Sequence, residues 1–373
     1  MSKKVLITAT VKSHICQFHK PLAEMLHKNG YEVHVATRTD LPEEDSLSID
    51  FVDKVYNVPF SRSPASKSNI KAYRELKKIM AENDYDIIHC NTPMGGVVTR
   101  LAARGLRKSG TKVIYTAHGF HFYKGAPLKN WLFYYPVEWL CSWFTDCIIT
   151  INTEDYNFAK KHLHALNIEY IHGVGVDGKR FVKLSREEAR NELGLSENMK
   201  VILSVGELSK RKNHETIIKA LKYVENPNII LYIAGYDQLN GELSSLTKKL
   251  MLENEVVFLG YTRDLSKYFA AADLYLFPSL QEGLPVALME AMFWGLPVIA
   301  SDIRGNNDLI AKDKGGVLLK PTDVYGFANS INKMLNDDNM LRGMGNYNKE
   351  RIRDFEIESV IKEIERVYFC SNM

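Results

Sequence analysis

Short apolar runs alternate with longer amphipathic patterns along this chain, and this alternation most restricts the folds open to it. In the first half, the continuous apolar or β-branched runs are 5–10, 32–37, 86–91, 112–118 and 147–152; in the second half they are 201–206, 229–235, 256–260, 274–279 and 297–301. Such runs are typical of strands buried on both faces of a parallel sheet. Helical spacing between them, as in 17–29, 67–83 and 95–108, predicts an α/β fold.

The alternation falls into two sets, separated by the Gly-rich stretch GVGVDGKRF at 173–181. A chain of 373 residues also suggests two domains rather than one. We expect two Rossmann-like, doubly wound domains, 1–175 and 176–354, with a C-terminal helix at about 355–373 packing back on the first. If the two face a cleft, ligands are expected there, at the carboxyl ends of the strands.

The charge is too small to predict a nucleic-acid groove, because the chain has a net charge of only +3. Residues 1–175 carry 22 Lys and Arg against 17 Asp and Glu, about +5, whereas the remainder carries 26 against 28, about −2. A mildly basic first half is compatible with an anionic membrane surface or a phosphorylated acceptor. It is equally compatible with ordinary scatter of charge.

Cysteine usage indicates a reducing, cytoplasmic location. The five cysteines, an odd number with no C-x-x-C spacing, are Cys16, Cys90, Cys141, Cys147 and Cys370. This pattern favours neither a disulfide framework nor a zinc site. The apolar run near the N-terminus is short and is interrupted by Lys12, so it predicts a buried strand rather than a signal peptide. No run of about 18 apolar residues predicts a membrane span.

A strand-to-helix junction with two carboxylates occurs at EGLPVALME, residues 282–290. Gly283 lets the backbone approach a ligand, and Pro285 suits the first turn of a helix. The free amides around Gly283 and Leu284 would then favour an anion at the start of this helix. Glu282 and Glu290 bracket this junction.

A second junction, VGELSKRKNHE at 205–215, also follows a strand and opens a helix at about Asn213. Gly206 and Lys212 lie in its loop, and we expect Lys212 to reach an anion held at the first junction. The alternative is a solvated surface lysine, which is the usual environment of Lys.

These junctions carry a resemblance to a known family. The pattern G-E-L-x3-K, followed by E-G-L-P-x4-E, resembles the donor-nucleotide half of glycosyltransferase family 4, which has the two-Rossmann GT-B fold. TAHGF at 116–120 and YDIIHCNTP at 85–93 are similar to motifs of the family's first domain. TATVKSHICQFHKPL at 8–22 and HGFHFYKG at 118–125 resemble bacterial enzymes of capsule, exopolysaccharide or O-antigen assembly most closely.

The resemblance implies roles for individual residues. Glu282 would bind hydroxyls of the transferred sugar, Glu290 would hold the ribose, and His118 would contact the sugar near the reacting carbon. Lys212 and the amides at Gly283 and Leu284 would stabilise the leaving diphosphate, so neither a metal nor a cofactor is expected. The predicted catalytic residues are His118, Glu282 and Lys212; the predicted donor contacts are Gly206, Lys212, Glu282, Gly283, Leu284 and Glu290.

Two positions depart from the family pattern. Glu207 stands where the family often has a basic residue, so either it turns away, toward Arg211, or phosphate binding rests on Lys212 and amides alone. VKSH replaces the usual Gly-rich turn after the first strand, which makes His14 and His19 candidate acceptor contacts. For His118, a packed or capping histidine is the alternative.

The aromatic segment 120–144 predicts a docking surface for an anionic membrane. Trp131, Tyr135 and Trp139 recur on one helix face, and Lys124 and Lys129 lie at its entry. Two further helices carry basic faces, formed by Lys67, Lys71, Arg74 and Lys78 and by Arg100, Arg104 and Arg107. An aromatic core helix with two solvated basic faces is an equally compatible interpretation.

The D-x-D-like sequence Asp84-Tyr85-Asp86 begins a buried strand and is therefore interpreted as structural rather than as a metal site. We expect an enzyme that moves a hexose or N-acetylhexosamine from a UDP-sugar to a polyprenyl-diphosphate-linked saccharide, with retention and without metal, at the inner face of the cell membrane. The alternatives are a GDP-mannose-dependent enzyme, a soluble acceptor, or a non-catalytic sugar-nucleotide-binding protein. A dinucleotide-dependent oxidoreductase is disfavoured, because no G-x-G-x-x-G follows the first strand.

Overall fold

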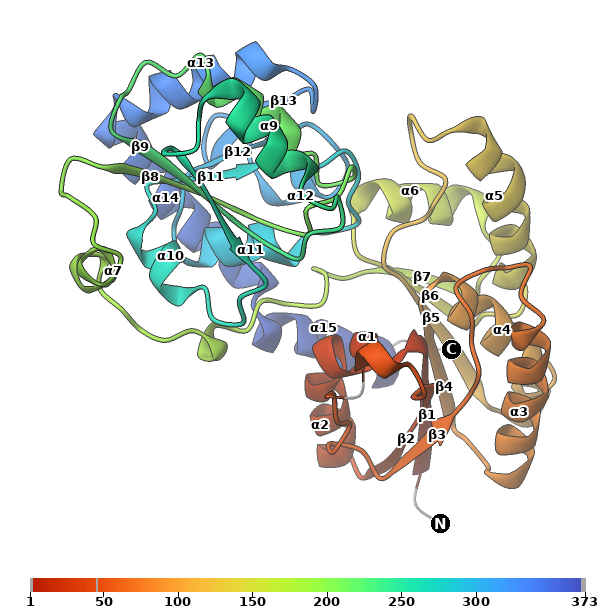
Figure 1. Ribbon diagram of the computed structural model, residues 1–373. Coiled ribbons are helices and arrows are strands. Elements are labelled where there is room, and N and C mark those ends of the chain that lie inside the picture. Colours follow the sequence, from red (N-terminus) through yellow and green to blue (C-terminus); the bar gives the residue numbers. More distant parts are fainter. Residues whose placement is uncertain (1–2, 45, 370–373) are drawn as a thin grey trace. The chain divides into compact units, whose positions relative to one another are not determined.

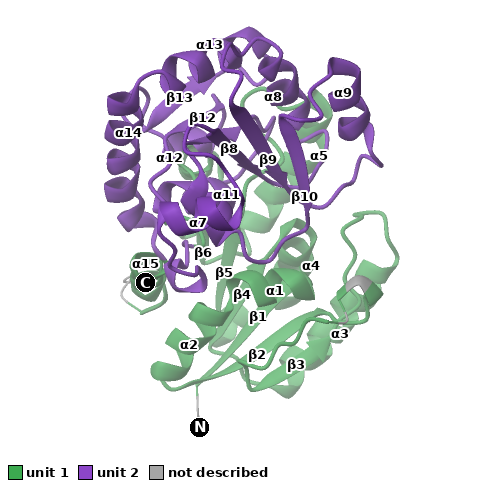
Figure 2. Ribbon diagram, turned by 60° about the vertical axis from the view of Figure 1, so that its left-hand side comes forward, with its two compact units in different colours: residues 1–174, 357–373 green, residues 175–356 purple. Residues whose placement is uncertain are grey.

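The computed structural model describes residues 3–44 and 46–369, which divide into two compact units (Figure 2). Unit 1 contains the chain up to Val174 together with the segment that begins at Ile357, and unit 2 is Gly175–Glu356. Figure 1 shows that helices cover both faces of the sheet in each unit.

Unit 1 contains a parallel sheet of seven strands. They are β1 (Lys3–Val11), β2 (Tyr31–Arg38), β3 (Lys54–Asn57), β4 (Ile87–Asn91), β5 (Lys112–Ala117), β6 (Cys147–Thr150) and β7 (Asn167–Tyr170), in the order β3-β2-β1-β4-β5-β6-β7. Val5 of β1 pairs with Val33 on one side and with Ile87 on the other. The strand order reverses between β1 and β4, which is the topological switch point where such sheets bind ligands.

Seven helices and two short 3-10 turns accompany this sheet within the described residues. They are α1 (Lys12–Phe18), α2 (Lys20–Lys28), α3 (Ser68–Glu82), α4 (Pro93–Ala103), α5 (Leu128–Ser142), α6 (Thr153–His162), α15 (Ile357–Phe369), η1 (Pro42–Glu44) and η2 (Leu106–Ser109). Helix α2 lies within the helix expected at 17–29, whereas α1 mostly precedes it. Apolar side chains of α3 and α4, among them Leu76 and Val98, pack on Leu6 and Ile88 of the sheet.

Helix α15 is fastened to unit 1 by polar contacts as well as by packing. Tyr368 Oη lies 2.5 Å from Nδ1 of His89, and the buried Lys112 Nζ donates to the Val367 carbonyl at 2.8 Å. His172 Nδ1 lies 2.7 Å from a Glu363 oxygen. The last helix therefore returns to the first sheet although about 180 residues of unit 2 separate them in sequence.

Unit 2 repeats the architecture with six parallel strands. They are β8 (Lys200–Val205), β9 (Ile229–Ala234), β10 (Val256–Gly260), β11 (Leu274–Phe277), β12 (Val298–Ser301) and β13 (Gly316–Leu319), in the order β10-β9-β8-β11-β12-β13. The strand order reverses between β8 and β11, which are paired in register at Ile202 and Leu274.

The helices of unit 2 follow the strands in the expected alternation. They are α7 (Arg186–Glu192), α8 (His214–Leu221), α9 (Glu242–Leu250), α10 (Ser266–Ala271), α11 (Val286–Phe293), α12 (Asn306–Leu309), α13 (Val324–Leu335) and α14 (Asp338–Arg351), with 3-10 turns η3 (Gly178–Arg180) and η4 (Ile352–Phe355). The prediction of two doubly wound α/β units is confirmed. Three short strands, β3, β7 and β13, were not predicted from the sequence. Each has only four residues with mostly partly buried or exposed side chains, so none stands out as a long, continuous apolar run.

No helix in residues 3–44 and 46–369 is long and apolar enough to cross a bilayer. Cys16, Cys90, Cys141 and Cys147 are free thiols, and Cys370 lies outside the described residues.

Candidate active site

The switch point of unit 2 brings together the two predicted junctions. Because β8 and β11 are neighbours, the loops that follow them meet, although Lys212 and Glu282 are 70 positions apart. Lys212 Nζ donates to Glu282 Oε1 at 2.8 Å, and Arg211 Nη1 donates to the same oxygen at 2.9 Å. The Lys212 and Glu282 side chains are only 11% and 9% exposed. The three side chains therefore form a compact charged cluster, in which Lys212 and Glu282 are largely shielded from solvent and Arg211 is partly exposed.

The local backbone explains why Lys212 points into this cluster. Asn213, the N-cap of α8, has a φ of 56° and donates from its amide nitrogen to the Pro278 and Pro321 carbonyls at 2.9 and 2.8 Å. This fixes the start of α8 against the end of β11. At Gly206, a Cβ would lie only 3.0 Å from Cδ of Lys212, so glycine gives the lysine stem its room.

Helix α11 presents its N-terminus beside Glu282. Pro285 is the N-cap rather than a residue of the first turn, which corrects the prediction by one position. The backbone amides of Gly283, Leu284, Val286 and Ala287 have no hydrogen-bond acceptor within the described chain. Unpaired amides at a helix start, with the helix dipole behind them, are an anion-binding arrangement.

A glycine lets a third loop close against this N-terminus. Gly305 has a φ of 81°, and a Cβ there would lie 2.3 Å from the Gly283 carbonyl oxygen, so a side chain would not fit. The neighbouring Arg304, which is buried, donates from Nε to the Glu282 carbonyl at 3.2 Å. The EGLP segment is thus held from the β12 side as well.

The second carboxylate of the motif, Glu290, lies inside α11 and is buried. Its Oε1 is 2.5 Å from Nη2 of Arg180, which reaches it from η3. Burial raises the pKa of Glu290 to about 7, and the Arg180 charge acts in the opposite direction. Arg180 was not singled out from the sequence, because a cation that is 110 positions away gives no local signal.

Glu207 turns toward a cation, as one of the two alternatives expected. Its carboxylate lies 3.7 Å from Nη2 of Arg211, and both side chains are partly exposed. Arg211 was missed as a site residue, although the run Lys210-Arg211-Lys212 before a helix could have indicated it. Arg211 therefore supplies the second positive charge that the acidic residue at 207 does not.

A histidine cluster occupies the carboxyl ends of the central strands of unit 1. The ring of His14 lies 4.7 Å from that of His118 and 5.2 Å from that of His19, centre to centre. His89, a residue of β4 that the sequence analysis did not select, is 6.3 Å from His19. Three of the four were predicted as site residues, and the structure brings these three together.

Burial holds these imidazoles neutral. It lowers the pKa of His118 to about 4 and that of His89 to about 3, and it lowers the pKa of His14 and His19 well below the usual value. His118 Nε2 lies 3.0 Å from Asn91 Oδ1, whereas Nε2 of His14 and of His19 are buried without a partner. Neutral rings with an unused nitrogen are suited to hydrogen-bond hydroxyl groups.

The D-x-D-like sequence has a structural contact, as interpreted: Asp86 Oδ2 accepts the Lys4 amide at 2.7 Å. The aromatic face predicted on α5 is exposed only at Trp139. Trp131 and Tyr135 are partly buried and pack with Phe122 and Phe158 of unit 1, while other apolar side chains of α5, such as Phe133, are exposed. The basic face predicted on α4, whether for docking or for solvent, was wrong at Arg100, which is completely buried.

Comparison with known proteins agrees with this architecture. Residues 4–152 match the family model described as Glycosyl transferase 4-like, and residues 185–351 match that of Glycosyl transferases group 1. The chain is 38% identical over 376 residues to the Putative glycosyltransferase EpsD of Bacillus subtilis (strain 168), covering 99% of this chain and 97% of the relative.

Two further proteins extend the comparison. The UDP-Gal:alpha-D-GlcNAc-diphosphoundecaprenol alpha-1,3-galactosyltransferase of Escherichia coli is 29% identical over 356 residues, covering 92% of this chain and 90% of the relative. The solved structure of Anabaena HepE in complex with UDP and glucose superposes with a TM-score of 0.80 at 20% identity, covering 98% and 99% of the two chains. Two parallel α/β units and these relatives together place the chain in the glycosyltransferases of the GT-B fold.

Proposed function

We propose that this enzyme is a retaining glycosyltransferase of family 4, which moves a hexose or N-acetylhexosamine from a UDP-sugar to a polyprenyl-diphosphate-linked saccharide. The observation that carries the donor site is that Lys212 and Arg211, from the loop after β8, both contact Glu282, the residue directly before the free amides at the start of α11. The name of the Escherichia coli relative, with its UDP-Gal donor and diphosphoundecaprenol acceptor, supports this choice of substrates. It also supports a role in cell-surface polysaccharide assembly.

In the proposed reaction, the bond between the anomeric carbon and the UDP β-phosphate oxygen breaks, and an acceptor hydroxyl oxygen bonds to that carbon. The acceptor proton passes to the leaving phosphate. Lys212, Arg211 and the α11 amides stabilise the negative charge that grows on this phosphate, which is where preorganised donors lower the barrier. Glu282 binds sugar hydroxyls, and Glu290 binds the ribose.

In unit 1, His118 is proposed to contact the transferred sugar, and His14 and His19 to contact the acceptor. Their unprotonated rings can each donate and accept a hydrogen bond. Because two cations and a helix N-terminus face the diphosphate, we propose that transfer needs no divalent metal and persists in a chelator.

The test is transfer of a radiolabelled sugar from a set of UDP-sugars to a polyprenyl-diphosphate GlcNAc acceptor, with and without EDTA. Glu282→Gln should lower turnover by roughly 10²-fold or more, because the sugar loses a charged hydrogen-bond acceptor in the transition state. UDP binding should stay within roughly threefold of the wild type, since the cations that face the phosphates remain. Wild-type turnover in the variant, or no transfer from any UDP-sugar, would contradict the proposal.

We also propose that unit 1 rests peripherally on the inner face of the cell membrane through α5. Six apolar side chains of α5 and its C-cap form the α5 apolar face, and four of them are more than half exposed, at 51–73%. The six are Leu128, Leu132, Phe133, Val137, Leu140 and Trp143. The one carboxylate in 120–144, Glu138, is buried against Arg100, so the exposed face carries Lys129 and no acid. An apolar helix face with basic flanks fits an anionic bilayer surface.

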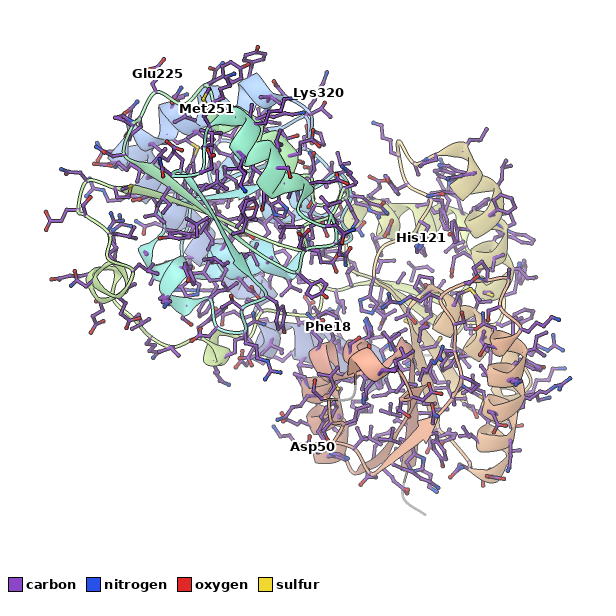
Figure 3. All side chains as sticks on the ribbon, in the orientation of Figure 1. Phe18, Asp50, His121, Glu225, Met251 and Lys320 are labelled. Carbon is purple, nitrogen blue, oxygen red and sulfur yellow. The ribbon has the colours of Figure 1, made fainter. Side chains whose placement is uncertain are left out.

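Phe133→Glu should reduce binding to phosphatidylglycerol vesicles by roughly tenfold or more, because one fully inserted aromatic side chain contributes about 1.5–3 kcal/mol. Met251→Glu is the matched control, since Met251 is 82% exposed in unit 2 and receives the same charge (Figure 3). Vesicle flotation at low salt measures both variants. A wild-type protein that ignores these vesicles, or equal losses in both variants, would exclude α5 as the docking surface.

A further inference from the structure

The segment that carries Arg180 is locked against α11. At Gly178, a Cβ would lie 2.3 Å from the ring of Phe293, so the backbone of η3 sits directly on that ring. Phe181 stacks on Phe293 with ring centres 5.7 Å apart. Asp177 caps η3 by accepting the Lys179 amide. These contacts fix the starting point of the Arg180 side chain relative to α11.

Arg180 is an accessible cation that pairs with the buried acid Glu290. Its side chain is 48% exposed, whereas that of Glu290 is 6% exposed, and one guanidinium nitrogen lies 2.5 Å from Glu290 Oε1. The guanidinium carbon also lies 5.0 Å from the centre of the Phe181 ring. A carboxylate has about four lone-pair sites, so contact with one arginine nitrogen leaves acceptor positions for a ligand.

The protonation state of Glu290 decides what it can bind. An ionised carboxylate only accepts hydrogen bonds, and both ribose hydroxyls are donors that it can accept together. A protonated carboxyl group uses one oxygen as a donor. Because burial brings the pKa of Glu290 to about 7, a small change in its surroundings shifts the balance between the two forms.

We propose that Arg180 is a positioning residue. It keeps Glu290 ionised and oriented, so that the carboxylate can accept hydrogen bonds from both ribose hydroxyls of the nucleotide. This inference rests on the proposed function, in which Glu290 binds the ribose. Arg180 acts through Glu290 and does not touch the reacting atoms. It gives the segment GVGVDGKRF, which the sequence analysis treated only as a seam between domains, a role in nucleotide recognition.

The other charged groups around α11 leave this role to Arg180. From β11, buried Tyr275 has a raised pKa and stays neutral, because of desolvation and the Glu290 charge. From α14, Lys349 lies against Gly295, beyond the end of α11, and Arg351 donates to the Leu309 carbonyl. Within the described chain, Arg180 is the cation that acts on Glu290.

The test compares Kd for UDP with Kd for 2′,3′-dideoxy-UDP between pH 6 and 9, in the wild type, Arg180→Met and Arg180→Lys. The ratio of Kd for 2′,3′-dideoxy-UDP to Kd for UDP reports the contact with the ribose diol alone. Titration of the phosphate near pH 6 affects both constants equally and cancels. In the wild type, the ratio should rise to roughly tenfold or more at high pH, with a midpoint near pH 7. Methionine keeps the apolar stem on Phe181 while removing the charge.

In Arg180→Met, the midpoint of this pH dependence should move to about pH 8 or above, so that the ratio is close to one at pH 7. Arg180→Lys should restore most of the wild-type dependence of the ratio on pH. An unchanged midpoint in Arg180→Met would overturn the inference, as would an equal loss of affinity for both nucleotides. Glu290→Gln separates this from the proposed function. If Glu290→Gln keeps the wild-type ratio, Glu290 is not the ribose contact. If Glu290→Gln brings the ratio to one while Arg180→Met leaves it unchanged, only the inference on Arg180 fails.

Discussion

Lys212→Ala is expected to lower kcat by roughly 10²–10³-fold and to weaken UDP binding by roughly tenfold or more. Lys212 is the most buried cation of the Glu282 cluster. In the proposed reaction, its removal takes away a fixed positive charge beside the phosphate on which negative charge develops. A fixed charge in a shielded site costs no reorganisation during the reaction, which is why its loss should affect turnover more than binding.

Lys210→Ala is the matched control for this prediction. Lys210 lies two positions away, is largely exposed and pairs with Glu242 instead of Glu282. Exposed ion pairs contribute little, so transfer by this variant should stay within roughly twofold of the wild type. Steady-state rates with a UDP-sugar measure both variants. If Lys212→Ala loses less than about fivefold in kcat, the catalytic cluster is misplaced.

The second large effect is expected on stability, at the buried ion pair between α4 and α5. Arg100 is completely buried and binds both oxygens of Glu138, and its guanidinium carbon lies 3.9 Å from the centre of the Tyr115 ring. Glu138→Ala should destabilise unit 1 by about 3–5 kcal/mol, because it leaves an unpaired cation in the core. The corresponding fall in Tm is roughly 10 °C for a unit of this size.

The double variant Arg100→Met/Glu138→Leu tests the cause. It replaces both charges with apolar side chains of similar length, so it should recover most of the stability lost by Glu138→Ala. Urea unfolding monitored by tryptophan fluorescence measures the free energy of unfolding of the wild type, the single variant and the double variant. The signal reports on this region because three of the four tryptophans lie on or next to α5. A double variant as unstable as the single one would show that packing, rather than the unpaired charge, sets the cost.

Much of the fold could be predicted because both sheets are parallel and buried on both faces. The central strands, such as 5–10 and 201–206, are continuous apolar runs, and a run of that kind is visible in the sequence without knowledge of its neighbours. The edge strands β3, β7 and β13 were missed for the opposite reason. Their pairing with a neighbouring strand defines them, and each is only four residues long, too short for a recognisable pattern.

In the candidate site, sequence spacing identified Glu282, Glu290 and Lys212, because each lies next to a recognisable strand-to-helix junction. Arg180 escaped notice because its contact spans 110 positions, and no local rule pairs an exposed arginine with a buried acid so far away. Arg100 was assigned to an exposed basic face because periodicity places residues on faces of a helix but does not say which face is covered. Only packing against α5 shows that its face is the buried one.

The central claim is that the β8–β11 switch point binds the diphosphate of a uridine nucleotide, and calorimetric titration of the wild-type enzyme with UDP, UMP and GDP tests it most directly. UDP should bind at least roughly tenfold more tightly than UMP, because only UDP carries the terminal phosphate that is proposed to contact Lys212, Arg211 and the α11 amides. It should also bind more tightly than GDP. Equal affinities for UDP and UMP, or no binding by a folded protein, would contradict the account, and tighter binding of GDP would replace the uridine donor with a guanosine one.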